Sequence, residues 1–187
     1  RHDIDGPADL VEEVVRIHGL ASVTSVPLPR DPGVTKPVLT KPQRRARAAR
    51  RALAARGFNE AVSFSFIGRG HAALFGGGDE ARQLSNPIAA DLDALRPTPL
   101  PALLAAAGRN TARGLGALCL FEIGPGFRSG MPDAQQTIAA GLRTGPAPRD
   151  WSRTAHEPDA FDVKADMLAA LEAAGGSAIS APVMRGA

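Results

Sequence analysis

The chain has 187 residues, about the size of one to one and a half domains, and a formal net charge of only +3. It has no run of eighteen apolar residues, which excludes a membrane-spanning helix. Its single cysteine, Cys119, excludes an intrachain disulfide and favours a reducing compartment. We expect Cys119, inside the apolar run 117–123, to be a small buried core residue. Because the chain begins with Arg1 and closes without a terminal element, we also expect it to be part of a longer one.

The first twenty residues predict a helix that begins at Pro7 and carries acid on one side. Its carboxylates follow an i, i+3, i+4 pattern, and a further acid on the incoming segment can reach the same point; the four residues are Asp3, Asp9, Glu12 and Glu13. Such oxygen ligands are those that Mg2+ prefers. Acidic residues in a first turn also offset the helix dipole without any metal, so both interpretations stay open at this point.

Residues 39–57 predict the best-marked helix of the chain. Thr40 and Gln43 have the spacing of a capping box, and Gly57 has the place of a left-handed cap. A narrow apolar stripe of Ala46, Ala49 and Leu53 predicts close packing on one side. The arginines spread over the rest of the helix circumference. This pattern favours a helix that faces solvent or another subunit; the alternative is a stand-alone RNA-binding module that uses residues 43–56.

The stretch after this helix alternates between apolar and small residues. Val62, Phe64 and Phe66 predict the inner face of a strand over 61–66, whereas the glycines of 68–78 predict a flexible loop without a phosphate-binding spacing. Further along, the apolar residues Ile88, Leu92 and Leu95 recur at the spacing of a helix.

The remaining pattern alternates helices and strands irregularly. We expect helices over 101–114 and 162–174, strands over 118–123 and 137–142, and a glycine turn over 124–126. Hairpin-like spacing between neighbouring strands predicts an α+β fold with an antiparallel sheet flanked by helices. No serine–histidine–aspartate order, HExxH or CxxC motif proposes a catalytic constellation.

The order of the motifs carries a resemblance. The opening RHDIDGPADLVEEVVRIHGL resembles a signature of the β subunit of bacterial phenylalanyl-tRNA synthetase. Five further segments resemble successive parts of that subunit's catalytic-like module, in the same order: residues 39–66, 85–110, 120–127, 139–145 and 161–175.

The resemblance implies a domain plan and a function. Residues 1–26 would end a preceding small domain, 27–39 would be a linker, and 40–187 would form a truncated, inactive class II synthetase core. The chain would be a non-catalytic structural and assembly part of a cytoplasmic enzyme of two α and two β subunits. That enzyme charges tRNA with phenylalanine using ATP, which the α subunit mainly binds; tRNA would be held by the full-length enzyme.

The resemblance also bears on individual residues. It implies that Asp3, Asp9, Glu12 and Glu13 bind Mg2+, since they match the four family positions. Active cores carry an arginine two residues before a strand glutamate, where it contacts the ATP α-phosphate, but the position two before Glu122 is Leu120, which cannot neutralise phosphate charge. Pro97 and Pro99 depart from the family's usual run before the following helix.

Overall fold

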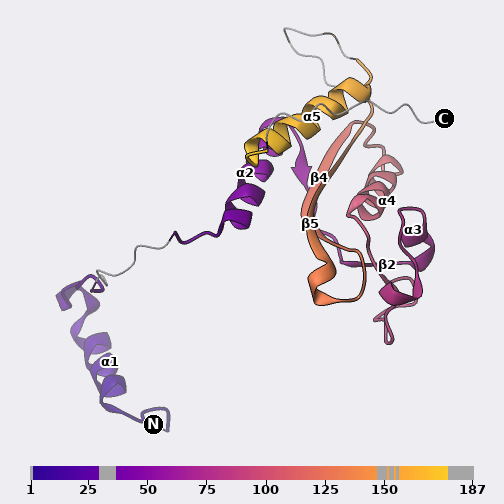
Figure 1. The fold of residues 1–187 in the computed structure, drawn as a ribbon. Coiled ribbons are helices and arrows are strands. Elements are labelled where there is room, and N and C mark those ends of the chain that lie inside the picture. Colours follow the sequence, from indigo (N-terminus) through magenta and orange to yellow (C-terminus); the bar gives the residue numbers. More distant parts are fainter. Residues whose placement is uncertain (1, 30–36, 147–150, 152–153, 155, 177–187) are drawn as a thin grey trace. The chain divides into compact units, whose positions relative to one another are not determined.

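The computed structural model describes residues 2–29, 37–146, 151, 154 and 156–176 (Figure 1). The chain divides into two compact units, Arg1–Val38 and Leu39–Ala187. Each unit is described by itself.

The described residues of unit 1 form one helix and one 3-10 turn. The predicted helix is confirmed as α1 (Pro7–His18), with Pro7 in its first turn, and η1 (Leu20–Ser22) follows. The apolar side of α1 is uncovered within this unit: Leu10, Val11, Val14 and Ile17 are between 58% and 76% exposed. None of the described residues of unit 1 is buried, so this unit has no hydrophobic core of its own.

Unit 2 begins with α2 (Lys41–Ala55), where the predicted capping box is confirmed. The Gln43 backbone N–H donates to Thr40 Oγ1 (3.4 Å), and the Thr40 N–H donates to Gln43 Oε1 (2.9 Å). Gly57 has the left-handed φ of 86° that a cap requires. The predicted stripe is confirmed as well, since Ala49 and Leu53 are buried and Ala46 packs against the same cluster.

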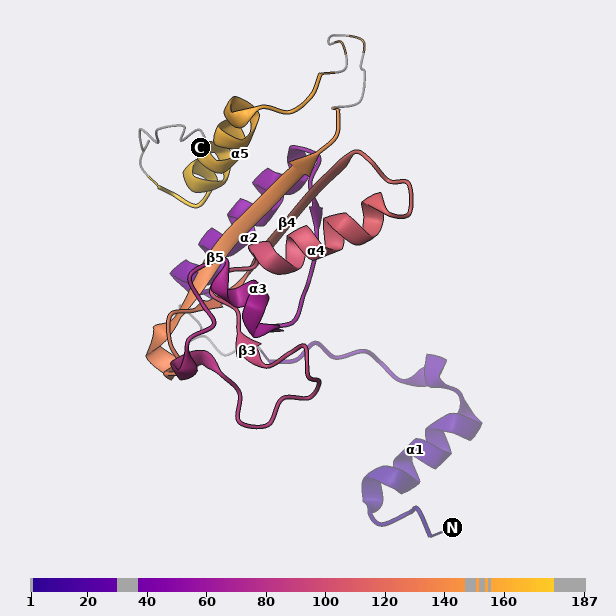
Figure 2. The same ribbon diagram turned by 90° about the vertical axis from the view of Figure 1, so that its right-hand side faces the viewer.

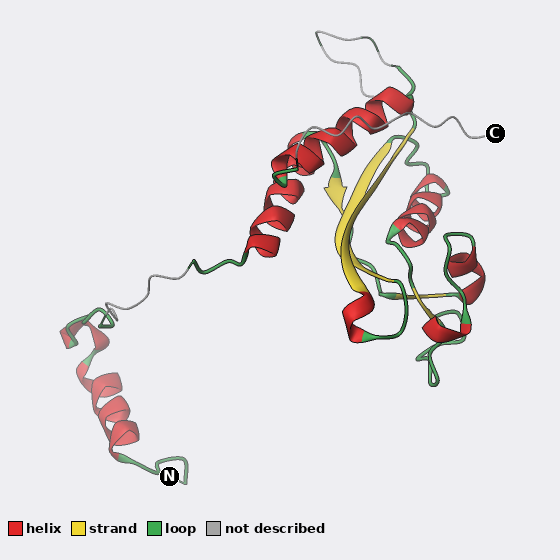
Figure 3. Cartoon of the chain, viewed as in Figure 1, coloured by secondary structure: helices red, strands yellow, loops and turns green. Residues whose placement is uncertain are grey.

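Over the residues that the structure describes, the main sheet has three strands in the order β1–β4–β5, drawn as arrows in Figure 3. They are β1 (Asn59–Glu60), β4 (Leu118–Phe127) and β5 (Gln135–Thr144). The long β4–β5 hairpin is antiparallel, whereas β1 runs parallel to β4. The α+β class is confirmed; the parallel pair makes the sheet mixed, which the expected antiparallel sheet did not include. A second pair, β2 (Phe66–Ile67) with β3 (Ala94–Leu95), is antiparallel.

Helices lie on both sides of the hairpin. In Figures 1 and 2, α2 and α5 (Ala160–Ala173) lie on one side and α4 (Leu100–Thr111) on the other. The main core joins α2, α5 and one face of β4; its buried members are Ala49, Leu53, Phe58, Phe121, Ile123 and Ala170. The helices predicted over 101–114 and 162–174 are confirmed as α4 and α5. Asp159 caps α5 by accepting from two backbone N–H groups.

The predicted inner face of residues 61–66 is wrong. Val62 and Phe64 are 92% and 68% exposed, and only the last two-residue step, Phe66–Ile67, is strand. The opposite side faces inward because the Ser63 hydroxyl donates to Glu122 Oε2 (2.5 Å), and a buried carboxylate needs such a donor. Satisfying that polar group decided which face of the segment turned inward.

Residues 68–95 also differ from expectation. The glycine-rich stretch contains α3 (Arg69–Ala73), whose Ala72 is fully buried, and is followed by η2 (Glu80–Arg82). The helical spacing of Ile88, Leu92 and Leu95 does not give a helix within the described residues. Ala94 and Leu95 form β3 instead, and the Asp93 side chain accepts from the Arg69 backbone N–H (2.7 Å).

The predicted glycine turn at 124–126 is wrong as well, because β4 continues through it to Phe127. A Cβ on Gly124 would lie 2.7 Å from Arg96 Nη2, and one on Gly126 would lie 2.5 Å from the Pro97 carbonyl oxygen. These glycines permit close approach rather than a reversal. The reversal comes later, at η3 (Pro132–Ala134).

Candidate functional site

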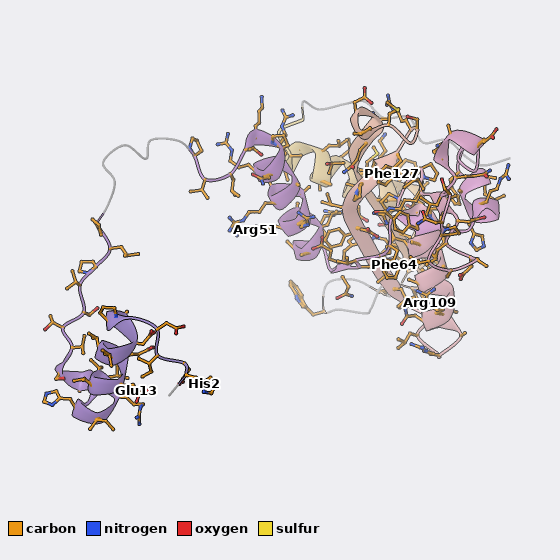
Figure 4. All side chains as sticks on the ribbon, turned by 90° about the horizontal axis from the view of Figure 1, so that it is seen from below. His2, Glu13, Arg51, Phe64, Arg109 and Phe127 are labelled. Carbon is orange, nitrogen blue, oxygen red and sulfur yellow. The ribbon has the colours of Figure 1, made fainter. Side chains whose placement is uncertain are left out.

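The four acids of unit 1 have the right ligand chemistry for Mg2+, but other groups of the protein engage Asp9 and Glu13. Asp9 Oδ2 accepts from the backbone N–H groups of Asp5 (2.9 Å) and Gly6 (2.8 Å), which fixes the helix start. Glu13, labelled in Figure 4, accepts from Arg16 Nη2 at 2.6 Å, and this bond raises the pKa of Arg16. Asp3 and Glu12 are exposed.

Within the described residues, no three histidine, cysteine or acidic side chains gather closely enough to hold a metal ion. The four acids as they lie therefore do not form a ready cluster of three or more ligands. The Mg2+ site at Asp3, Asp9, Glu12 and Glu13 stays a prediction.

In unit 2, the most enclosed polar centre is an ion pair between Arg96 and Glu122, which are 1% and 4% exposed. Arg96 precedes α4, whereas Glu122 lies on β4. The guanidinium donates from Nη2 to Glu122 Oε1 (2.7 Å) and from Nη1 to Ser63 Oγ (2.8 Å). It also donates from Nε to the Pro125 carbonyl (2.8 Å). The Arg96 side chain therefore links the start of α4 to β4 and to the segment that contains Ser63.

This arrangement is closed and complementary. Burying a charge costs several kcal/mol unless it is paired and its remaining donors are satisfied, as they are here. Glu122 accepts from both Arg96 and Ser63, so its carboxylate is held by the protein's own groups. The centre can join β4 to the start of α4, but it offers no open carboxylate to a ligand.

Leu120 lies two residues before Glu122 on β4, so both side chains project from the same face of the strand. Leu120 is opposite Asn59 of β1 and Leu142 of β5, so the position that holds an arginine in active cores is uncharged in this chain. An arginine does follow the strand, since Arg128 is exposed directly after Phe127. Our sequence reasoning considered only position 120 and therefore missed it.

Sequence reasoning also missed Arg96. Its position between Leu95 and Pro97, among apolar and proline residues, was a usable signal, because an isolated arginine in such a run has to find a partner once it is buried. The signal does not identify the partner, which lies 26 residues away.

A second charged centre surrounds Asp166 of α5, which is 4% exposed. Its carboxylate accepts from Arg56 Nε and Arg143 Nε, both at 2.5 Å. The hydrogen bond to Asp166 raises the pKa of Arg143, whose guanidinium also stacks 4.6 Å from the Phe58 ring centroid. Arg143 also lies 3.4 Å from Cys119 Sγ; this cysteine is half-buried rather than buried. The centre ties the end of α2 and β5 to α5.

Two hollows flank this second centre. An apolar one of about 440 Å³ lies among α2, α5 and β5, and a more polar one of about 680 Å³ lies around Arg56, Arg143 and His156. Neither is lined by Arg96 or Glu122.

Comparison with known proteins identifies the family. The domain described as the CLM domain of the phenylalanyl tRNA synthetase beta chain matches residues 27–182. The chain belongs to this family. A phenylalanine–tRNA ligase beta subunit of Rhodospirillum rubrum is 56% identical over 184 residues, which cover 98% of this chain and 23% of that protein. One of Paramagnetospirillum magneticum is 49% identical over 185 residues, with 98% and 23% covered.

Membership of the phenylalanyl-tRNA synthetase β chain family removes the alternative of a stand-alone RNA-binding module, because the matched domain is part of a synthetase chain. The chain spans about a quarter of the length of these curated relatives.

Two solved structures are similar at low sequence identity. A pyrrolysyl tRNA synthetase of Desulfitobacterium hafniense has a TM-score of 0.49 and 20% identity, covering 71% of this chain and 45% of that one. A histidine–tRNA ligase subunit of Alicyclobacillus acidocaldarius has a TM-score of 0.48 and 18% identity, covering 82% and 44%. Among the described residues, no helix is long and apolar enough to cross a membrane.

Proposed function

We propose that this chain is a non-catalytic structural and assembly part of a cytoplasmic phenylalanine–tRNA ligase, an enzyme that charges tRNA with phenylalanine using ATP. The observation that carries the proposal is the family match over residues 27–182. The partner is the α subunit of the same enzyme, in an assembly of two α and two β subunits. Contact with tRNA belongs to the full-length enzyme.

The non-catalytic role is supported by the centre at Glu122. Its carboxylate is enclosed by Arg96 and Ser63, and position 120 on the same face is leucine. A nucleotide phosphate would need cationic or hydrogen-bonding groups on that face. Titration of ATP into the β chain without its α subunit should give no saturable heat; saturable binding that Arg128→Ala abolishes would contradict the proposal.

The assembly role is tested by co-expression of the complete β chain with its α subunit. The two should elute together from a sizing column at the size of a complex of two α and two β subunits. A β chain that elutes alone in the presence of intact α subunit would contradict the assignment.

The arginine-bearing side of α2 is the surface that we assign to this contact. Arg44, Arg47 and Arg51 are exposed and spaced by three and four residues, so they share one side of the helix, and Figure 4 labels Arg51 there. Among the described residues, no ion pair involves them. An acidic partner surface would relieve their mutual repulsion.

We also propose that Asp3, Asp9, Glu12 and Glu13 bind Mg2+. The proposal is supported by the chemistry of these side chains, because carboxylate oxygens are ligands that Mg2+ prefers. Calorimetric titration of Mg2+ into the complete β chain should give heat that an Asp9→Asn, Glu13→Gln variant loses. Equal heats from both proteins would remove the metal from the proposal.

A further inference from the structure

The polar hollow of about 680 Å³ lies where α2 and β5 end and where β4 begins. Its charged lining residues are Arg56, Arg143, His156 and Asp162. Apolar side chains complete the wall, among them Leu118 and Pro158. A hollow of this volume, with apolar walls and a few charged groups, has the size and character of a site for a small organic group.

Arg143 has little hydrogen-bonding capacity left for a ligand. Its Nε and Nη2 donate to the Asp166 carboxylate at 2.5 and 3.1 Å, and its Nη1 donates to Cys119 Sγ at 3.4 Å. Its guanidinium also lies over the Phe58 ring. Arg143 therefore gives the hollow a positive charge at a fixed position, but few open donors.

Arg56 keeps most of its donors available. One hydrogen bond holds it, from Nε to Asp166 Oδ1 (2.5 Å). Among the residues that the structure describes, no acceptor binds its Nη1 or Nη2, and its side chain is 38% exposed. A guanidinium that is anchored through Nε offers its two Nη groups as a planar fork, and this fork matches the two oxygens of a carboxylate.

Asn59, at the start of β1, adds a second polar side chain to the same hollow. This side chain is exposed and makes no hydrogen bond within the described part of the chain. Its amide N–H groups can donate to an acceptor that Arg56 holds. The groups of the hollow that remain open to a ligand are therefore mainly donors.

Two carboxylates limit the charge that the hollow can accept. Both oxygens of Asp166 are bound by the two arginines. Asp162 Oδ2 accepts from a backbone N–H (2.9 Å) and lies 3.3 Å from His156 Nε2. Because these two acids balance the charges of the two arginines, a ligand with several negative charges, such as a triphosphate, would be repelled. A singly charged acceptor suits the hollow better.

We infer that the polar hollow binds a single carboxylate group. Its two oxygens accept from Arg56 Nη1 and Nη2, Asn59 donates to one of them, and the carbon chain of the ligand lies against the apolar wall. The carboxylate belongs either to a free organic acid or to an acidic side chain of a partner subunit. The inference of a carboxylate site does not depend on the proposed function.

Saturation-transfer NMR of propionate with the complete β chain tests the inference, because this probe has one carboxylate and a short apolar tail. The signal should saturate with a dissociation constant of about 1–10 mM, as expected for so small a ligand. Propionamide has the same shape without the charge and should give no saturable signal. Equal signals from both probes, or no saturation by propionate up to about 50 mM, would overturn the inference.

Arg56→Gln should weaken propionate binding at least about tenfold, because it removes the charged fork. Arg113→Gln makes the same change at an exposed arginine outside the hollow and should leave binding unchanged. Since Arg56 also holds Asp166, Asn59→Asp provides a second variant that leaves that ion pair intact. Its added carboxylate should compete for Arg56 and weaken binding too. Full binding by both Arg56→Gln and Asn59→Asp would overturn the inference.

The same titration on the complex with the α subunit identifies the source of the natural carboxylate. Loss of propionate binding in the complex supports an acidic side chain of the α subunit, which then fills the hollow. Retained binding supports a free organic acid. Formation of the complex is read separately on a sizing column, so a failure of assembly, which concerns the proposed function, is distinguished from a failure to bind propionate.

Discussion

Arg96 Nη2 donates to Glu122 Oε1 across 2.7 Å, although the two residues are 26 positions apart in the sequence, and both side chains are almost fully buried. We expect Glu122→Ala to lower the free energy of unfolding by about 3–5 kcal/mol, because it leaves the Arg96 charge buried without its partner. Urea unfolding of the parent and the variant measures the difference.

The double variant Arg96→Met, Glu122→Leu provides the matched control. Replacing both charges with apolar groups removes the uncompensated charge, so the loss should be clearly smaller than for Glu122→Ala. A double variant as unstable as the single one would mean that the packing around Pro125 and Ser63, rather than charge pairing, governs this centre.

Asp166 is the shared acceptor of Arg56 and Arg143, which come from the end of α2 and from β5. Asp166→Asn keeps the shape but removes the charge, and we expect a loss of about 3 kcal/mol, at the low end for a broken buried pair because Arg56 is partly exposed. Thermal unfolding provides the measurement. Asp133→Asn, on the exposed turn after β4, is the control that should change little.

Acid should destabilise the module through α5. The backbone N–H of Asp159 donates to Asp162 (2.9 Å) and lowers the pKa of this carboxyl below its ordinary 3.8, and His156 acts in the same direction. A depressed folded pKa contributes stability above about pH 4, and this is lost as the pH falls through the folded value. Unfolding free energies measured from pH 7 to pH 3 should fall less steeply for Asp162→Asn than for the parent.

The buried and the exposed residues of α2 should affect different properties of the protein. Leu53 is 5% exposed inside the module's own core, so Leu53→Glu should prevent folding itself and cannot report on assembly alone. The informative change is Arg47→Glu with Arg51→Glu, which should weaken α subunit binding at least tenfold while the β chain melts normally. Arg109→Glu with Arg113→Glu makes the same charge change at exposed residues in the last turn of α4 and just after it, and should leave binding intact.

Much of the fold was predictable where short-range signals act. The capping residues of α2 and the left-handed Gly57 depend on neighbours within a few positions. The starts of α1, α2, α4 and α5 were predicted within two residues, whereas the end of α4 was predicted three residues too late. Residues 61–66 failed because alternation alone does not say which face turns inward. That choice depended on Ser63 meeting Glu122, a contact between distant segments.

The candidate site was less predictable for the same reason. Nothing near Arg96 in the sequence indicates Glu122, and nothing near Asp166 indicates the two arginines that bind it. The glycines of β4 were interpreted as a turn because their close approach to Arg96 and Pro97 is a tertiary property. The acids of unit 1 were visible as a pattern, but a pattern does not say whether Asp9 serves a helix start or an ion.

The absence of buried residues in the described part of unit 1 has a calorimetric consequence. The heat capacity change of unfolding comes from apolar surface that becomes exposed, and α1 has little left to expose. A scan of this 187-residue chain should therefore give one cooperative peak whose enthalpy reports on residues 39–187. Unit 1 would contribute only a gradual, sloping baseline.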